Sequence, residues 1–231
     1  GGGPTGVEFA AEMHDFLTED LRKSYPGLTT DLKITLLEAG ENILNSFDAT
    51  LSEYTRRIFR RQKIEVKTKS PVKRVEANMI VLANGEKIPY GLAVWSTGIG
   101  PTDFVKSLRL PKDRAHRLLT DEYFRVKETP HPARQRRDTR LPHGTNWSGQ
   151  AQTVLFALGD CSSVEGKNYP ATAQVAQQAG QYLADALSRI ARGLPVRAFR
   201  YKHYGMLAYI GSSKALADLS TIKGRGFSTW L

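Results

Sequence analysis

The first six residues constrain the fold most, because Gly1, Gly3 and Gly6 form the pattern G-x-G-x-x-G within "GGGPTGVEFAAE". Between a strand and a helix, this spacing lets the chain turn tightly, lets a pyrophosphate approach the backbone and lets the helix pack closely on the sheet. The helix N-terminus then offers unpaired N–H groups and positive potential to the phosphates. By itself the pattern also fits a glycine-rich start of an ordinary helix. The choice between this alternative and a dinucleotide-binding motif depends on the rest of the sequence.

Helix and strand periods alternate after this motif. Apolar residues recur at helical spacing over residues 5–23, and residues 33–39 predict a short buried parallel strand. Asp48 or Thr50 is suited to cap a second helix. Further short strands are predicted at 64–70, 71–77, 79–90 and 92–98.

A tight turn is predicted at Asn84-Gly85, within the third of these strands. The order of elements predicts an α/β, Rossmann-type unit over residues 1–100, and we expect its first strand to precede Gly1. The second half of the chain also contains a predicted helix and predicted strands, in a less regular order. Strands are predicted at 117–127 and 153–160, a helix at 170–190 and strand-like structure at 199–219. Residues 128–152 are polar, basic and rich in Pro and Gly, and are predicted to be a disordered insertion.

Composition limits the function classes. The 231 residues carry a net charge of +10, which favours an anionic partner such as a phosphorylated cofactor, an anionic membrane surface or a nucleic acid. No nucleic-acid-binding motif is visible, so no nucleic-acid partner is predicted. Cys161 is the only cysteine, which excludes an internal disulfide or a CxxC pair within these residues. No apolar run is long enough to cross a membrane, and no group of metal ligands is predicted.

Glu38 ends the predicted strand at 33–39. A carboxylate at this place accepts hydrogen bonds from the adenosine ribose hydroxyls of NAD and repels the 2′-phosphate of NADP. The alternative is a solvent-exposed glutamate at a strand end. With the glycine motif upstream, we favour the ribose role.

Small residues end two other predicted strands. Thr97 and Gly98 lie in "STGIG", and Asp160 lies in "ALGDCS". Glycines at a carboxyl edge allow a flat cofactor to approach, and a carboxylate there binds a polyol or ribose hydroxyl. Both stretches also fit ordinary turns.

The helix after Pro170 is the most specific stretch, "YPATAQVAQQAGQYLA". Its N-terminus offers positive potential to an anionic ring. Gln174 and Gln178 are i,i+4 neighbours on one face, and neutral amides can bind the carbonyl groups of a quinone. The alternative is a pair of surface glutamines.

Together these motifs resemble the type II (alternative, non-proton-pumping) NADH:quinone oxidoreductases. The matching stretches occur in the family's order over nearly the whole chain, except 128–152: "GGGPTGVEFAAE", "LLEAGENIL", "IPYGLAVWSTG", "FALGDCS", "PATAQVAQQAGQYLA" and "GMLAYIGSSKALAD". The resemblance implies a two-dinucleotide-binding-domain flavoprotein in which NADH passes a hydride to FAD, and FAD passes electrons to a membrane quinone.

The resemblance also implies roles for individual residues. Gly1, Gly3, Gly6 and Glu38 would hold NADH, and Glu8 would lie near the nicotinamide as a catalytic residue. Thr97 and Gly98 would line the contact between nucleotide and flavin, and Asp160 would bind the ribityl chain of FAD. Ala173 opens the AQxxxQ element and is grouped with the cofactor-binding residues. Gln174 and Gln178 would frame the quinone, with Tyr209 and Lys214 as weaker candidates for its wall.

By the same resemblance, residues 1–100 are the NADH-binding domain, 101–190 a returning segment of the FAD domain, and 191–231 the start of a quinone- and membrane-associated region. The other FAD half would lie upstream and membrane-associating helices downstream, so the chain alone is expected not to bind flavin or to be active. The expected location is peripheral, on the mitochondrial inner membrane or a bacterial cytoplasmic membrane, and a homodimer is compatible with the family. Two alternatives stay open: a pyridine nucleotide-disulfide reductase with its redox cysteines upstream, and a non-catalytic NAD- or FAD-binding module.

Overall fold

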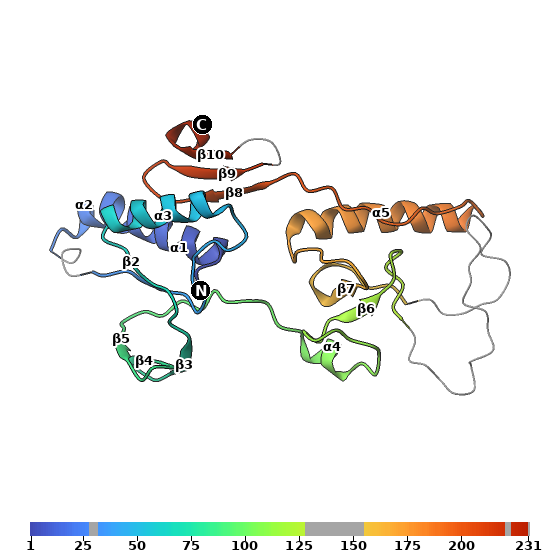
Figure 1. Ribbon diagram of the computed structural model, residues 1–231, viewed down its shortest axis with the longest axis horizontal. Coiled ribbons are helices and arrows are strands. Elements are labelled where there is room, and N and C mark those ends of the chain that lie inside the picture. Colours follow the sequence, from blue (N-terminus) through green and yellow to red (C-terminus); the bar gives the residue numbers. More distant parts are fainter. Residues whose placement is uncertain (28–31, 128–154, 220–222, 231) are drawn as a thin grey trace. The chain divides into compact units, whose positions relative to one another are not determined.

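The computed structural model describes residues 1–27, 32–127, 155–219 and 223–230 (Figure 1). These residues form two compact units, the first of Gly1–Gly98 with Tyr204–Leu231 and the second of Ile99–His203. The predicted insertion at 128–152 lies outside the described residues. The predicted division into NADH, FAD and quinone segments stays a prediction, although the C-terminal residues pack with the first unit.

The first unit begins with the nucleotide-binding half of a Rossmann fold. One continuous helical run confirms the helix predicted over residues 5–23; it consists of α1 (Pro4–Asp15), a π-helical stretch (Phe16–Leu21) and α2 (Arg22–Ser24). The predicted parallel strand is also confirmed, because β1 (Thr35–Leu37) pairs in parallel with β2 (Glu65–Lys67).

Helix α3 (Ala49–Arg61) connects these two strands. Its N-cap is Asp48, whose carboxylate accepts a hydrogen bond from the Thr50 N–H at 2.9 Å, so of the two predicted caps the structure selects Asp48. Leu51 and Ile58 are buried on one face of the helix. The spacing of seven residues places both on the side that packs against the core.

A small antiparallel sheet follows, as the sequence predicts. It contains β3 (Val72–Val75), β4 (Met79–Leu82) and β5 (Lys87–Pro89) in that order. Gly85 lies in the β4–β5 turn with φ of +88°, a conformation that glycine adopts at no steric cost. The predicted tight turn is therefore confirmed.

The strand predicted at 92–98 is wrong for this structure, because these residues form no ladder with any described segment. A strand is stabilised by hydrogen bonds to a neighbouring strand, and an apolar pattern in one segment does not supply that neighbour. The apolar side chains of this segment are correspondingly open to solvent: the exposed fractions of Leu92 and Trp95 are 73% and 65%.

The strand-like stretch near the C-terminus forms an antiparallel sheet of order β10-β9-β8. Its strands are β8 (Met206–Tyr209), β9 (Ala215–Asp218) and β10 (Lys223–Gly226), followed by the short helix α6 (Phe227–Trp230). In Figure 1, β8 lies alongside α1, and the two elements are in contact. This sheet shares one core with the nucleotide-binding half; the buried members include Val7, Ala10, Ala11, Phe59, Ala208, Ile210 and Leu216.

The second unit contains a two-stranded parallel sheet and one long helix. Its elements are α4 (Asp103–Ser107), β6 (Leu118–Thr120), a 3-10 turn (Gly159–Cys161), β7 (Ser162–Val164) and α5 (Ala173–Ala191). The predicted strand at 153–160 is wrong in its described part, where only Phe156 forms an isolated bridge, with Arg125. The predicted helix is confirmed, but its N-cap is Thr172 and Pro170 lies outside it.

Aromatic side chains make most of the core beneath α5. Phe124 and Phe199 are buried with their ring centroids 4.8 Å apart, and Tyr169 and Tyr182 meet Phe199 edge-on. Such pairs add about 0.5–1.5 kcal/mol beyond the burial of their area. This cluster fixes the start of α5 and the segment around Phe199 relative to each other within the unit.

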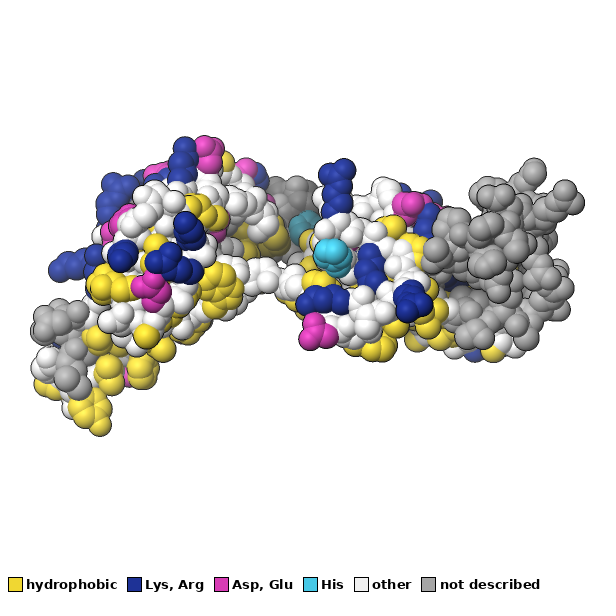
Figure 2. Space-filling model, turned by 90° about the horizontal axis from the view of Figure 1, so that it is seen from below, with side chains coloured by type: hydrophobic (Ala, Val, Ile, Leu, Met, Phe, Trp, Pro, Cys, Tyr) yellow, Lys and Arg dark blue, Asp and Glu magenta, His cyan; other side chains and the backbone are white. Residues whose placement is uncertain are grey.

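Basic side chains are spread over the surface of both units, and on the face shown in Figure 2 they are more frequent than acidic ones, in keeping with the net charge of +10. In the described ranges, no helix combines the length and the hydropathy needed to cross a membrane.

Gly211, in the turn between β8 and β9, should be intolerant of substitution. Its φ is +86°, and a Cβ there would lie 2.6 Å from the Gln62 Nε2 atom. We expect Gly211→Ala to lower the free energy of unfolding by about 1–3 kcal/mol, from backbone strain and crowding together. Denaturant unfolding measures this, with Gly91→Ala as the control because a Cβ at Gly91 meets nothing within 4 Å. Equal stability of the two variants would contradict the prediction.

Candidate nucleotide and cofactor sites

The glycine motif forms the start of α1, with Gly3 as the N-cap. A Cβ on Gly6 would lie 1.8 Å from the Gly1 carbonyl oxygen, so no larger residue fits there without moving the backbone. Gly3 differs, because its φ of −69° suits any residue and a Cβ there would meet nothing within 4 Å. The chain itself therefore needs glycine at position 6, whereas at position 3 the missing side chain leaves the backbone open to an outside group.

Glu38 lies directly beside this motif. Its carboxylate accepts one hydrogen bond from the Gly2 N–H and one from the Gly40 N–H, each at 2.6 Å. A Cβ on Gly2 would come within 2.9 Å of the Glu38 Oε2 atom, so Gly2 also has to be small. The carboxylate thus ties the end of β1 to the glycine motif, and the structure brings Gly1, Gly3, Gly6 and Glu38 together.

Thr97 also lies at the glycine motif, although its segment is not a strand. A Cβ on Gly1 would be 3.1 Å from the Thr97 Cγ2 atom, and a Cβ on Gly6 would be 2.9 Å from the Ser96 hydroxyl oxygen. Ser96 is a neighbour of the motif that the sequence reasoning missed. Gly98 ends the first unit, and a Cβ there would meet nothing within 4 Å.

Glu8 lies in α1, two residues after Gly6, the last glycine of the motif. Its Oε1 atom accepts a hydrogen bond from the backbone N–H of Tyr209 in β8 at 3.3 Å. No other hydrogen bond to this carboxylate comes from the described residues. Strand β8, distant in sequence, therefore contacts the helix that the glycine motif begins.

Asp15, at the other end of α1, is a buried carboxylate that the sequence reasoning missed. Its Oδ2 atom accepts hydrogen bonds from the Tyr209 hydroxyl at 2.5 Å and from the Ser212 N–H at 2.8 Å. Burial acts to raise the pKa of Asp15, but these hydrogen bonds and one with His14 outweigh it and lower the pKa. Burial and the bond to Asp15 raise the pKa of Tyr209 to about 12. No sequence signal links residues so far apart.

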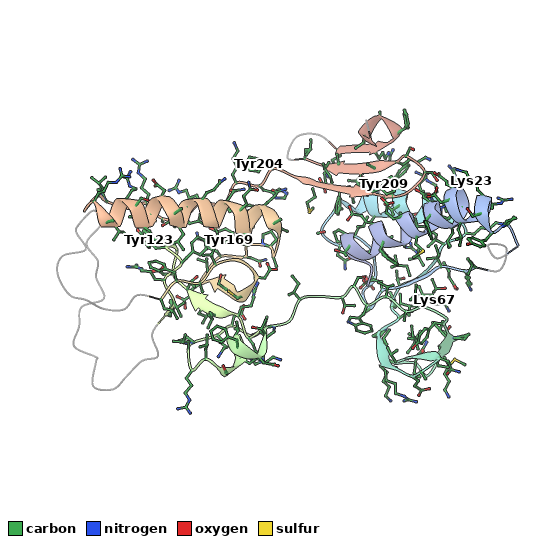
Figure 3. All side chains as sticks on the ribbon, turned by 180° about the vertical axis from the view of Figure 1, so that it is seen from behind. Lys23, Lys67, Tyr123, Tyr169, Tyr204 and Tyr209 are labelled. Atoms are coloured by element: carbon green, nitrogen blue, oxygen red, sulfur yellow. The ribbon has the colours of Figure 1, made fainter. Side chains whose placement is uncertain are left out.

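The second unit holds Asp160 and the start of α5 around one small pocket. Asp160, Lys167, Tyr169 and Thr172 line it, with the β7 residues Ser162, Ser163 and Val164. Ala173 begins α5 next to this lining. The pocket therefore combines a carboxylate with the N-terminal end of a 19-residue helix, which attracts negative charge. Tyr169, one of the labelled side chains in Figure 3, marks its place beneath α5.

Gln174 and Gln178 project from α5 toward the segment after Phe199. The Gln178 amide binds the backbone of Lys202 twice: Nε2 donates to the carbonyl at 2.8 Å, and Oε1 accepts from the N–H at 3.0 Å. The Gln174 Oε1 atom accepts from the Tyr201 hydroxyl at 3.3 Å. Both glutamine side chains thus have polar partners within the protein. The alternative that they are simply surface glutamines did not predict these partners. Tyr209 and Lys214 belong to the other unit.

Comparison with known proteins places this chain. Residues 1–131 match the family model described as pyridine nucleotide-disulphide oxidoreductase. The chain is 39% identical to "Probable NADH dehydrogenase" of Dictyostelium discoideum, over 100% of this chain and 47% of that protein. It is 38% identical to "Internal alternative NAD(P)H-ubiquinone oxidoreductase A1, mitochondrial" of Arabidopsis thaliana, over 99% of this chain and 43% of that protein.

The fold has a close counterpart among solved structures. NDH2 from Plasmodium falciparum in complex with NADH superimposes with a TM-score of 0.80 at 22% identity, over 100% of this chain and 59% of that chain. This likeness confirms the α/β flavoprotein fold predicted from the sequence. The chain spans about half the length of the curated relatives it matches. With a family model that matches more than half of its residues, the chain belongs to the pyridine nucleotide-disulphide oxidoreductase family.

Proposed function

We propose that the protein containing this chain is a type II NADH:quinone oxidoreductase, which moves electrons from NADH through FAD to a membrane quinone without pumping protons. The relatives' names support this reading, since they are NADH dehydrogenases and NAD(P)H-ubiquinone oxidoreductases. The observation that carries it is the Glu38 carboxylate, held by the Gly2 and Gly40 N–H groups beside a glycine motif whose Gly3 faces open space.

The first unit supplies the NADH site in this proposal. The open backbone at Gly3 and the N-terminus of α1 accept the pyrophosphate. Glu38 already accepts two backbone N–H groups, and each carboxylate oxygen has a second lone pair for a ribose hydroxyl. A 2′-phosphate at this place would meet the negative charge of Glu38 at short range, so the site favours NADH over NADPH.

Glu8 orients the nicotinamide end of NADH in this proposal. The Tyr209 N–H holds its Oε1 atom, which leaves Oε2 to accept a hydrogen bond from a donor on the nucleotide. Thr97 and Gly98 lie where the chain leaves the first unit, and we place them against the nicotinamide ring.

The second unit fits one part of FAD. Asp160 offers a carboxylate to the ribityl hydroxyls, and Ala173 and its neighbours at the N-terminus of α5 present positive potential to an electron-rich ring. When bound, FAD supplies the two-electron chemistry that links hydride donation by NADH to reduction of the quinone. In this proposal, Glu38 and Glu8 position NADH, and Asp160 positions FAD. Glu38 also disfavours a nucleotide with a 2′-phosphate.

Gln174 and Gln178 are proposed to frame the quinone, and their observed partners sharpen the test. In the full-length enzyme, Gln174→Ala should slow the quinone-dependent half-reaction about 2- to 10-fold, the value of one neutral hydrogen bond, and leave the NADH-dependent half-reaction nearly unchanged. Gln178→Ala should do the same and also lower the melting temperature, because it releases the Lys202 backbone. Stopped-flow spectrophotometry follows both half-reactions. Unchanged quinone kinetics in both variants would leave these glutamines a structural role only.

The proposed location is the surface of the mitochondrial inner membrane, with peripheral attachment and a homodimeric assembly. Several relatives carry "mitochondrial" in their names, and the excess of basic side chains suits an anionic lipid surface. Flotation of the full-length protein with cardiolipin-containing vesicles tests the attachment, and light scattering tests the dimer.

Steady-state assays of the full-length protein test the proposed activity as a whole. The proposal predicts NADH-dependent reduction of a short-chain ubiquinone and no NADH-dependent reduction of disulfides such as lipoamide or oxidised glutathione. Disulfide reduction without quinone reduction would instead identify a disulfide reductase. Neither activity, with bound nucleotide, would identify a non-catalytic binding module.

A further inference from the structure

We propose that Tyr209 is a positioning residue for the NADH site, and that the turn between β8 and β9 holds it there. The proposal rests on the proposed role of Glu8. The C-terminal sheet of β8, β9 and β10 would then take part in NADH binding, because β8 contacts α1 on the face that carries Glu8.

Tyr209 contacts two carboxylates of one helix. Its backbone N–H donates to Glu8 Oε1 at 3.3 Å, and its hydroxyl donates to Asp15 Oδ2 at 2.5 Å. Glu8 and Asp15 are seven residues apart, which in an α-helix means two turns on the same face and about 10.5 Å along the axis. One residue of β8 therefore spans much of α1. In Figure 3 the labelled Tyr209 lies beside that helix.

The turn that follows Tyr209 is held in a costly conformation. Gly211, Ser212 and Ser213 have φ values of +86°, +52° and +55°. Non-glycine residues in this region cost on the order of 1 kcal/mol each or more, and such strain persists only where surrounding bonds enforce it. The enforcing bonds are the Ser212 N–H to Asp15, the Ser213 N–H to the Tyr209 hydroxyl, and the Gln62 amide to the Ser212 hydroxyl.

Among the described residues, α1, Tyr209 and the end of α3 therefore each contribute a bond to this turn, and the Lys214 ammonium adds one to the Ser212 carbonyl at 3.1 Å. Stored strain of this kind concentrates where a side chain must be held in one place. The group that gains is Glu8, because the Tyr209 N–H holds one of its two carboxylate oxygens. A fixed carboxylate loses less rotamer entropy when a ligand donates to its other oxygen.

A double-mutant cycle in the full-length protein tests this inference through binding of NAD⁺, measured by isothermal titration calorimetry, so the readout does not depend on turnover. The variants are Tyr209→Phe, Glu8→Gln and the pair. Tyr209→Phe keeps the backbone N–H that binds Glu8 but removes the hydroxyl bond to Asp15 that anchors Tyr209 on α1. We expect this loss of positioning to weaken NAD⁺ binding about 2- to 10-fold, and to have less than about a 2-fold effect once Glu8 is Gln.

Tyr90→Phe is the matched control. The Tyr90 hydroxyl donates to the Glu76 carbonyl at 2.6 Å within the small antiparallel sheet, so the variant removes an equivalent bond from the same unit. It should lower the melting temperature and leave the dissociation constant for NAD⁺ unchanged.

Three results would overturn the inference. Additive effects of Tyr209→Phe and Glu8→Gln would show that Tyr209 does not act through Glu8. An equal loss of binding in Tyr90→Phe would reduce the effect to general destabilisation. Normal NAD⁺ binding by Glu8→Gln would remove the role of Glu8 itself, and the inference with it. The proposed NADH:quinone activity would be unaffected by that result, because the steady-state assays test it separately.

Discussion

Replacing Gly3 by Ser in the full-length protein is expected to weaken NADH binding about 10- to 150-fold while the protein remains folded. The loss corresponds to about 1.4–3 kcal/mol, the cost of forcing a side chain into a close contact between backbone and pyrophosphate. Folding should be unaffected, because a Cβ at Gly3 meets nothing within 4 Å and serine is a favourable N-cap. The measurements are the KM for NADH and the melting temperature.

Gly6→Ala is the contrasting variant within the same motif. Its Cβ would lie 1.8 Å from the Gly1 carbonyl oxygen, so the start of α1 has to move and stability should fall by about 3 kcal/mol or more. NADH binding should be lost together with stability. If Gly3→Ser bound NADH normally, the open face of the motif would not be the pyrophosphate site.

Replacing Glu38 by Gln is expected to lower kcat/KM for NADH about 10- to 100-fold and to narrow the preference over NADPH. Two effects combine. Removal of the negative charge relieves repulsion of the 2′-phosphate, which favours NADPH in relative terms. In the wild type, the two carboxylate oxygens accept hydrogen bonds from the Gly2 and Gly40 N–H groups. The NH2 group of glutamine replaces one of these acceptors, so one of the two N–H groups loses its partner. An unpaired buried N–H group costs about 1–3 kcal/mol.

Glu41→Gln provides the control for charge alone. Glu41 is close to Glu38 in sequence, but its side chain is 75% exposed and pairs with Lys69 at the surface. It should alter neither the KM for NADH nor the cofactor preference. Equal use of NADH and NADPH by the unaltered enzyme would contradict the role given to Glu38.

Local patterns predicted much of the fold, because their causes are local. The helical run after the glycine motif, the strand that Glu38 follows and the turn at Asn84-Gly85 all depend on residues within a few positions of each other. The strand predicted at 92–98 failed for the opposite reason. A strand needs a hydrogen-bonded neighbour, and none of the described segments pairs with these residues.

The candidate sites divide in the same way. The glycine spacing and a carboxylate at a strand end indicated the contact between Gly2 and Glu38, since parallel strands bring their carboxyl ends to one edge. The contacts of Tyr209 with Glu8 and Asp15 join residues about 200 positions apart and follow no motif. The binding of Gln178 to the Lys202 backbone was equally hidden, because an amide that mimics a peptide group can pair with any residue.

The most direct test of the central claim is an anaerobic two-step stopped-flow experiment on the full-length protein. NADH is mixed first and a short-chain ubiquinone second, while the visible absorbance of bound flavin is recorded. We expect NADH to bleach the flavin band and the quinone to restore it, at rates that sustain the steady-state turnover. A flavin band that NADH does not bleach, or that the quinone does not restore, would contradict the central claim.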